Sequence, residues 1–154
     1  MSIIKKSFLE VKAGGLKILV RKLFTFITLI LSVPLYLISF IVLIIIYIIK
    51  PVYLIRFGNL NSSRLGHFAS NTELYLCERD AKINLPKQKY LDLFFLQNIS
   101  NDQIAKMWKR ELTILPSLIL NPIYFLNKLI SYYFPSVKNH IVTTSKSDRD
   151  VHNL

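Results

Sequence analysis

The chain has 154 residues, about the length of one domain, and a formal net charge of +11. With 52% hydrophobic residues it is too apolar to be disordered. One cysteine excludes an internal disulfide, and with only three scattered histidines beside it we predict no metal site. A chain that is both apolar and basic indicates a membrane partner and predicts no nucleic-acid partner.

The apolar residues concentrate in one uncharged run, from Leu23 to Ile49. As a helix rising ~1.5 Å per residue, this run would be about 40 Å long. A bilayer core of roughly 30 Å therefore allows one crossing but not two. The run does not end in small residues, as the run of a cleaved signal peptide does. We predict a retained membrane segment over residues 23–49.

The flanks of this run leave its topology open. Residues 1–22 are basic, predict an amphipathic flank on anionic lipid, and are placed in the cytoplasm by the positive-inside rule. A simple crossing would put residue 50 onward outside. However, Lys50, Arg56 and Arg64 follow before any acid, and Pro34 could kink the run. A re-entrant segment with both ends in the cytoplasm is therefore the alternative.

The rest of the chain alternates between strand and helix patterns. We predict strand, helix, strand and helix at Val52–Phe57, Arg64–Arg79, Tyr90–Leu96 and Asp102–Leu115. Ser100 or Asn101 is placed to cap the second helix. Leu93 to Leu96 is apolar without alternation, which predicts a strand covered on both faces. This order predicts an α/β fold with a parallel sheet.

The helical periodicity predicts which side chains face inward. The expected inner faces are Leu65, Phe68, Thr72, Tyr75 and Leu76 in the first helix, and Ile104, Met107, Trp108 and Leu112 in the second. Residues 117–134 form another apolar stretch, interrupted at Asn121 and Pro122. We expect it to pack on the domain as a helix or to lie at the lipid surface. Residues 143–154 are expected to be a polar tail.

The segment from Arg56 to Asp80 is the candidate site. In α/β folds, ligands bind where a loop leaves the carboxyl end of a strand and enters a helix, whose dipole favours anions. Gly66 would let the backbone approach a ligand, and Arg64 and His67 supply polar or positive groups. A phosphate or a sugar hydroxyl suits this arrangement, although similar loops without ligands are common. The spacing is neither a dinucleotide fingerprint nor a P-loop.

Residues 64–76, RLGHFASNTELYL, resemble the R-(I/L)-G-H-x-x-x-N-x-E signature of an uncharacterised family of bacterial glycosyltransferases linked to surface-polysaccharide synthesis. The likeness continues through residues 91–95 and 99–108 and covers about 52–115. It implies a two-domain GT-B-type architecture with Rossmann-like halves. The N-terminal half would shape the acceptor side, and the C-terminal half would hold the nucleotide-sugar.

The resemblance implies roles for five residues. His67 and Glu73 would be catalytic, and Arg64, Gly66 and Asn71 would bind substrate, with no cofactor and no metal. From the residues alone, His67 could equally make a structural hydrogen bond and Arg64 could be a solvated charge. Glu73 could be a surface acid, and Asn71 could pack its helix.

The chain ends at residue 154, where the family would continue, and two predicted strands would leave a sheet edge open. The expectation is an N-terminal fragment with an incomplete Rossmann-like half domain over residues 50–142 and a C-terminal partner half. It predicts a glycosyltransferase at the bacterial inner membrane, with the C-terminal part cytoplasmic, that is active once completed. Its partners would be membrane lipids, a nucleotide-sugar donor and a glycan or lipid-linked acceptor. The alternative is a non-catalytic, membrane-anchored interaction protein.

Overall fold

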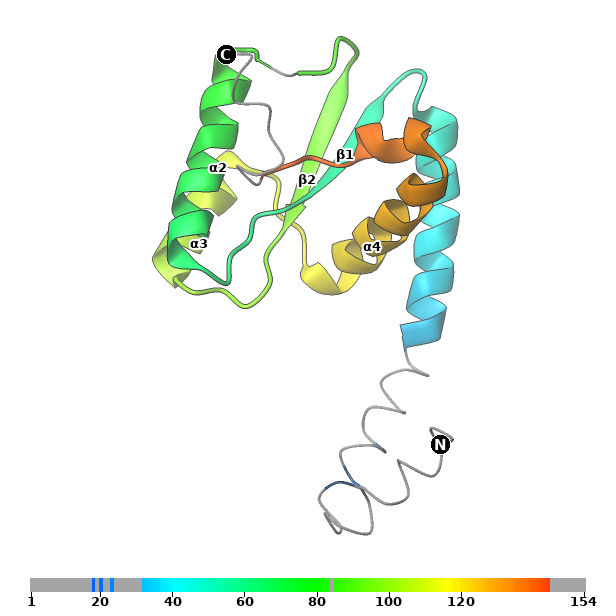
Figure 1. The fold of residues 1–154 in the computed structure, drawn as a ribbon, viewed down its shortest axis with the longest axis horizontal. Helices are drawn as coiled ribbons and strands as arrows, with labels where there is room; N and C mark the ends of the chain where they lie inside the picture. The colour runs from blue at the N-terminus through cyan, green and yellow to red at the C-terminus, as the bar shows by residue number, and fades with distance from the viewer. Residues whose placement is uncertain (1–17, 19, 21–22, 24–31, 84, 145–154) are drawn as a thin grey trace. The chain divides into compact units, whose positions relative to one another are not determined.

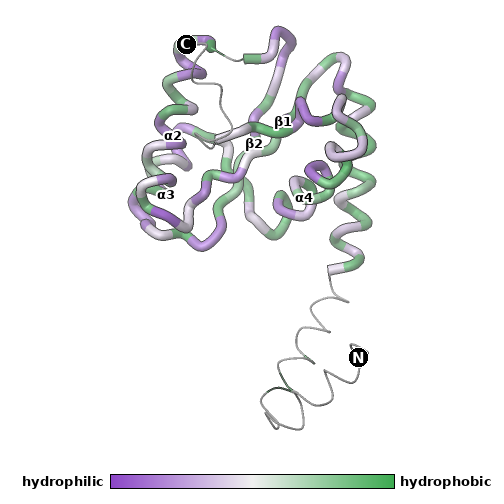
Figure 2. The backbone as a smooth tube through the Cα atoms, in the orientation of Figure 1, coloured by the Kyte–Doolittle hydropathy of each residue, from purple (hydrophilic) through white to green (hydrophobic). Residues whose placement is uncertain are grey.

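The computed structural model describes residues 18, 20, 23, 32–83 and 85–144. The chain divides into two compact units, Met1–Leu37 and Ile38–Leu154. Apart from residues 18 and 20, the predicted basic flank lies outside the described residues, as does the tail beyond residue 144. The helix Ser32–Ile49 is long and apolar enough to cross a membrane, and its hydrophobic character is visible in Figure 2.

The larger unit is a mixed α/β structure (Figure 1). After the apolar helix, its elements are β1 (Leu54–Asn59), α2 (Leu65–Asp80), β2 (Tyr90–Phe95), α3 (Asp102–Glu111), α4 (Ser117–Tyr133) and the 3-10 helix η1 (Pro135–His140). The predicted order of strands and helices is therefore confirmed. β1 begins two residues later than expected because the amides of Val52 and Tyr53 still bond the carbonyl of Ile49 at the helix end.

The two strands are parallel, as predicted, with Leu54 opposite Tyr90 and Asn59 opposite Phe95. Two further segments extend the sheet by one parallel bridge each. Ile141 pairs with Phe57 on the outer side of β1, and Ile114 pairs with Phe94 on the outer side of β2. Each edge that the sequence left open is thus flanked by a returning segment of the same chain.

Both faces of the sheet are covered. Phe94 and Phe95 point to opposite faces, and each is 0% exposed, which confirms the prediction from the unalternating strand. One face packs against α2 and α3 with the cluster Leu60, Phe68, Tyr75, Leu76, Phe94, Leu96, Ala105, Trp108, Leu112 and Val142. The other packs against α4 and the apolar helix with Leu43, Ile46, Phe57, Phe95, Leu120 and Ile123. Figure 1 shows these helices on the two sides.

Two inward assignments were wrong. Leu65 and Met107 are exposed, because Leu65 opens the first turn of α2 and Met107 lies on the outer side of α3. Of the two candidate caps, Asn101 is the one used: its Oδ1 accepts from the amides of Gln103 at 2.9 Å and Ile104 at 3.1 Å. These bonds satisfy helix amides that have no partner within the helix.

α3 ends at Glu111 rather than Leu115 because the next residues pair with β2. The amide of Phe94 donates to the carbonyl of Thr113 at 2.9 Å, and the amide of Leu115 donates to the carbonyl of Phe94 at 2.8 Å. The expected interruption at Pro122 does not divide the next element, since α4 runs through it. α4 packs on the domain, which was one of its two expected positions.

Candidate functional site

The loops that follow β1 and β2 lie side by side and are joined by Ser62. Its hydroxyl donates to the carbonyl of Gln97 at 2.5 Å and accepts from the Gln97 amide at 2.8 Å. Its carbonyl accepts from the amide of Ser100 at 2.9 Å. Ser62 is 1% exposed. The loops at the carboxyl ends of the two strands are therefore linked by hydrogen bonds to each other rather than independent.

Arg64 and His67 lie together at this edge. With Asn61 and Ser63 they line a shallow hollow of about 230 Å³. Arg64 occupies the N-cap position of α2 with an extended backbone, and its side chain makes no capping hydrogen bond. Asn61 has a φ of 50°, a left-handed conformation that asparagine tolerates better than most residues. The hollow thus offers a guanidinium, an imidazole, an amide and a hydroxyl at a helix N-terminus.

The other three predicted site residues do not line this hollow. Gly66 is exposed in the first turn of α2, and a methyl group added there would meet no described residue within 4 Å. Glu73 is exposed six residues after His67, a rise of about 9 Å along the helix. Asn71 is 2% exposed, and its Nδ2 has no hydrogen-bond partner among the described residues.

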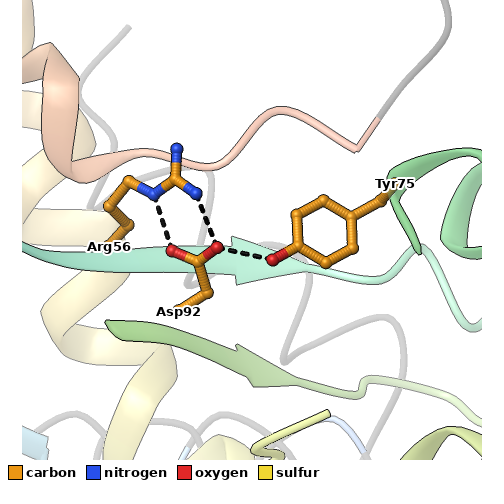
Figure 3. A network of polar contacts seen from close by, with 3 residues as sticks. All are labelled: Arg56, Tyr75 and Asp92. Carbon is orange, nitrogen blue, oxygen red and sulfur yellow. Dashed lines mark hydrogen bonds and ion pairs between the residues drawn. The ribbon is translucent and has the colours of Figure 1, made fainter. Parts of the chain in front are cut away.

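A buried polar network that the sequence reasoning missed lies on the same sheet face (Figure 3). Arg56 donates from Nε and Nη2 to the two carboxylate oxygens of Asp92, each at 2.6 Å. The hydroxyl of Tyr75 donates to Asp92 Oδ2 at 2.5 Å. The Arg56 guanidinium also lies 4.7 Å from the ring centroid of Tyr90. The sequence did carry a signal for this ion pair. The third residue of one strand is an arginine and the third residue of the other is an aspartate, and a parallel register places them opposite each other.

The side chains of this network have a structural role rather than a catalytic one. The ion-pair side chains of Arg56 and Asp92 are only 11% and 7% exposed. Burial, followed by the hydrogen bond to Asp92, raises the pKa of Tyr75 well above the ordinary tyrosine value, so the hydroxyl keeps its proton. The network therefore ties the middle of α2 to Asp92 of β2, which is itself paired with Arg56 of β1.

The opposite face of the unit joins the apolar helix to the domain. Leu43 and Ile46 are buried against β1, β2 and α4. The hydroxyl of Tyr47 donates to Asn127 Oδ1 at 2.7 Å, and Lys50 Nζ donates to the carbonyl of Ser136 at 2.5 Å. The last turns of the apolar helix are therefore part of the domain core on one side.

Large apolar side chains remain exposed on both of these helices. On the apolar helix they include Ile38, Ile41, Ile44, Ile45, Ile48 and Ile49; on and just after α4 they are Leu118, Ile119, Phe125, Leu129, Tyr132, Tyr133 and Phe134. Exposed apolar surface of this extent is typical of membrane or protein contact. Tyrosine is also enriched at the level of lipid headgroups.

Among the described residues, no three His, Cys, Asp or Glu side chains gather closely enough to hold a metal ion. No protein-family model, curated protein or solved structure matches the chain.

Proposed function

We propose that the chain is the acceptor-side half of a membrane-attached glycosyltransferase. It would act in bacterial surface-polysaccharide synthesis at the cytoplasmic face of the inner membrane. A sugar would pass from an activated donor to a lipid-linked or saccharide acceptor. One observation carries the proposal: Arg64 and His67 share an exposed hollow at the carboxyl ends of two parallel strands. In this proposal the α/β unit is a Rossmann-like half of a GT-B-type enzyme.

The residues of the hollow divide the task by their chemistry. The Arg64 guanidinium would hold a phosphate of the acceptor, because its planar fork matches phosphate oxygens. His67 would take the proton from the acceptor hydroxyl as that oxygen attacks the anomeric carbon of the donor sugar, and the bond from that carbon to the nucleotide diphosphate would break, with the diphosphate as the leaving group. Gly66 would leave room for the ligand beside the backbone of the first helical turn. Glu73 would contact an acceptor only if that acceptor extended along α2.

The packing of the apolar helix supports a lipid-linked acceptor. Because Leu43 and Ile46 are held in the domain core, the domain cannot drift from the membrane surface as a domain on a flexible linker could. A hollow on such a unit would stay near the lipid headgroups. An acceptor carried by a lipid phosphate would then be presented at high local concentration.

Transfer can be tested in membranes from the cells that make the protein. Radiolabelled nucleotide-sugars are supplied, and label in the lipid-extractable glycan is counted. Arg64→Ala and His67→Ala should each lower transfer by about tenfold or more, with unfolding unchanged because both side chains are exposed. Arg110→Ala, an exposed arginine on α3, is the matched control. Unchanged transfer in both variants would show that Arg64 and His67 do not form the catalytic site.

The side of the membrane can be tested with the native cysteine. Cys77 is exposed on α2 and is the chain's one cysteine. A membrane-impermeant maleimide should label it in opened cells but not in intact spheroplasts. Cys77→Ser supplies the unlabelled control. Labelling in intact spheroplasts would place the α/β unit outside and exclude a cytoplasmic nucleotide-sugar as donor.

The sheet edges favour a second candidate, a membrane-anchored interaction protein. β2 has six residues, yet its outer edge is bridged only at Phe94 among the described residues. On the outer edge of β1, by contrast, the carbonyls of Ile55, Phe57 and Asn59 are already bonded to His140, Val142 and Thr144. The edge of β2 could accept a strand from another chain. Two results together would favour this candidate. A stable complex would be recovered from the membranes, and Arg64→Ala and His67→Ala would leave transfer unchanged.

A further inference from the structure

The direction in which the chain adds segments across its sheet reverses once. From β1 it passes through α2 to β2, then through α3 to Ile114, moving steadily to one side. It then returns through α4 and η1 to place Ile141 on the opposite side of β1. Loops on the two sides of such a reversal leave in opposite directions, which opens a crevice outside the carboxyl ends of the strands.

The structure has a hollow at this position. It measures about 850 Å³ and receives residues from three segments that the reversal brings together. Asn59 and Asn61 follow β1, Tyr124, Lys128 and Ser131 come from α4, and Lys138 and Ile141–Thr144 come from η1 and the returning segment. The volume lies within the roughly 300–1,000 Å³ of small-molecule sites. Asn61 also borders the smaller hollow at Arg64, so the two are neighbours.

The charge around this crevice has one sign. Lys128 and Lys138 line it, and no carboxylate among the described residues does. The sequence has no acid between Glu10 and Glu73, which spans the β1 side, or between Glu111 and Asp148, which spans the α4 side. Both walls are therefore built from acid-free stretches, and the potential inside favours an anion.

The remaining wall is polar. Thr144 donates from its hydroxyl to the carbonyl of Asn59 at 2.7 Å, which ties the returning segment to the end of β1. The amide of Asn61 donates to Asn59 Oδ1 at 3.1 Å, and Ser131 donates to the carbonyl of Lys128 at 2.8 Å. The Asn59 side-chain amide and the Ser131 hydroxyl are thus held in place by local bonds, and the oxygen of each can still accept from a ligand hydroxyl.

We propose that this crevice binds a sugar phosphate. Lys128 and Lys138 would hold the phosphate, and Asn61 and Ser131 would hydrogen-bond the sugar hydroxyls. The phosphate ester could be free in solution or attached to a polyprenyl lipid. The inference goes beyond the proposed function, since the crevice would bind this ligand even if Arg64 and His67 transferred nothing.

Binding is measured on the full chain in phosphatidylcholine nanodiscs by calorimetry with glucose 1-phosphate. Lys128→Ala and Lys138→Ala should each weaken binding by about tenfold, the scale of one lost hydrogen bond to a charged group. Lys106→Ala, an exposed lysine on α3, should leave binding unchanged. Glucose without the phosphate should bind far more weakly.

A second arm distinguishes the source of the phosphate. Polyprenyl-phosphate-linked glucose is placed in the nanodisc, and exposed lysines are acetylated with and without it. Protection of Lys128 and Lys138, but not Lys106, in this arm supports a lipid-borne ligand, and protection only by glucose 1-phosphate supports a soluble one. Protection by neither overturns the proposal. Full binding in both lysine variants, or loss only in Arg64→Ala, overturns it as well.

Discussion

Arg56 and Asp92 face each other across the two parallel strands and form a bidentate ion pair, with both N–O distances 2.6 Å. Asp92→Asn should lower the free energy of unfolding by about 3–5 kcal/mol, because it leaves the arginine charge buried and unpaired. Urea unfolding in mild detergent measures the loss. The matched control is Asp80→Asn, whose exposed pair with Arg79 should contribute less than about 1 kcal/mol. Equal losses would contradict the prediction.

Tyr75→Phe isolates the third member of this network. The variant keeps the ring and its edge-to-face contact with Phe94, whose centroid is 5.1 Å away, and removes only the hydroxyl. We expect a loss of about 2 kcal/mol, the typical contribution of a hydrogen bond to a charged acceptor. In the Asp92→Asn background the same change should cost less, as a double-mutant cycle would show.

Gly66→Ala separates stability from ligand approach. Since an added methyl group would meet nothing within 4 Å in the part of the chain that the structure describes, the change should stabilise α2 by about 0.5–1 kcal/mol. If a ligand lies against this turn, sugar transfer should fall in spite of the higher stability. A more stable variant with full transfer would show that no ligand approaches Gly66.

Folding stability should fall as the pH drops below about 6.5. His140 is fully buried, and its Nδ1 lies 2.6 Å from the carbonyl of Ile55. Burial lowers the pKa of His140 below the ordinary histidine value, with the hydrogen bond to Ile55 opposing the shift and Lys50 adding to it. The unfolded chain therefore takes up a proton at a pH where the folded chain does not. Unfolding between pH 5.5 and 8 should show the slope, and His140→Gln should flatten it.

Leu43 and Ile44 are neighbours on the apolar helix that test whether this helix belongs to the domain. Leu43 is 0% exposed and Ile44 is 43% exposed. Leu43→Ala should cost about 2–5 kcal/mol by leaving a cavity, whereas Ile44→Ala should cost far less. Thermal unfolding in nanodiscs compares them. Two equally mild effects would mean that the helix does not pack on the domain.

The sequence was sufficient to predict the helices and strands that depend on local residue patterns. β1, α2 and β2 follow from apolar runs and helical spacing, and the parallel sheet follows from their order. The end of α3 did not follow, because Thr113 and Leu115 exchange helix bonds for bonds to Phe94, a partner known only after folding. Tertiary pairing overrides local propensity in this way at many element ends.

The sequence predicted which residues of the candidate site lie together only where they are close in the chain. Arg64 and His67 are three residues apart on one helix start, and the structure places them in one hollow. Lys128 and Lys138 come from α4 and η1, and only the reversal of the chain brings them beside Asn59. Asn71 is buried, which agrees with the alternative that it packs its helix rather than with the binding role that the signature implies.

The packing of Leu43 and Ile46 into the same cluster as Phe57, Phe95, Leu120 and Ile123 has a consequence for biogenesis. In the proposed membrane-attached protein, the apolar helix precedes the strands in the chain and would enter the membrane before they are made. The strands and α4 would then complete their core against a helix that is already anchored. A chain that began at Pro51 would leave this cluster facing water, so soluble expression of the α/β unit alone should give aggregates.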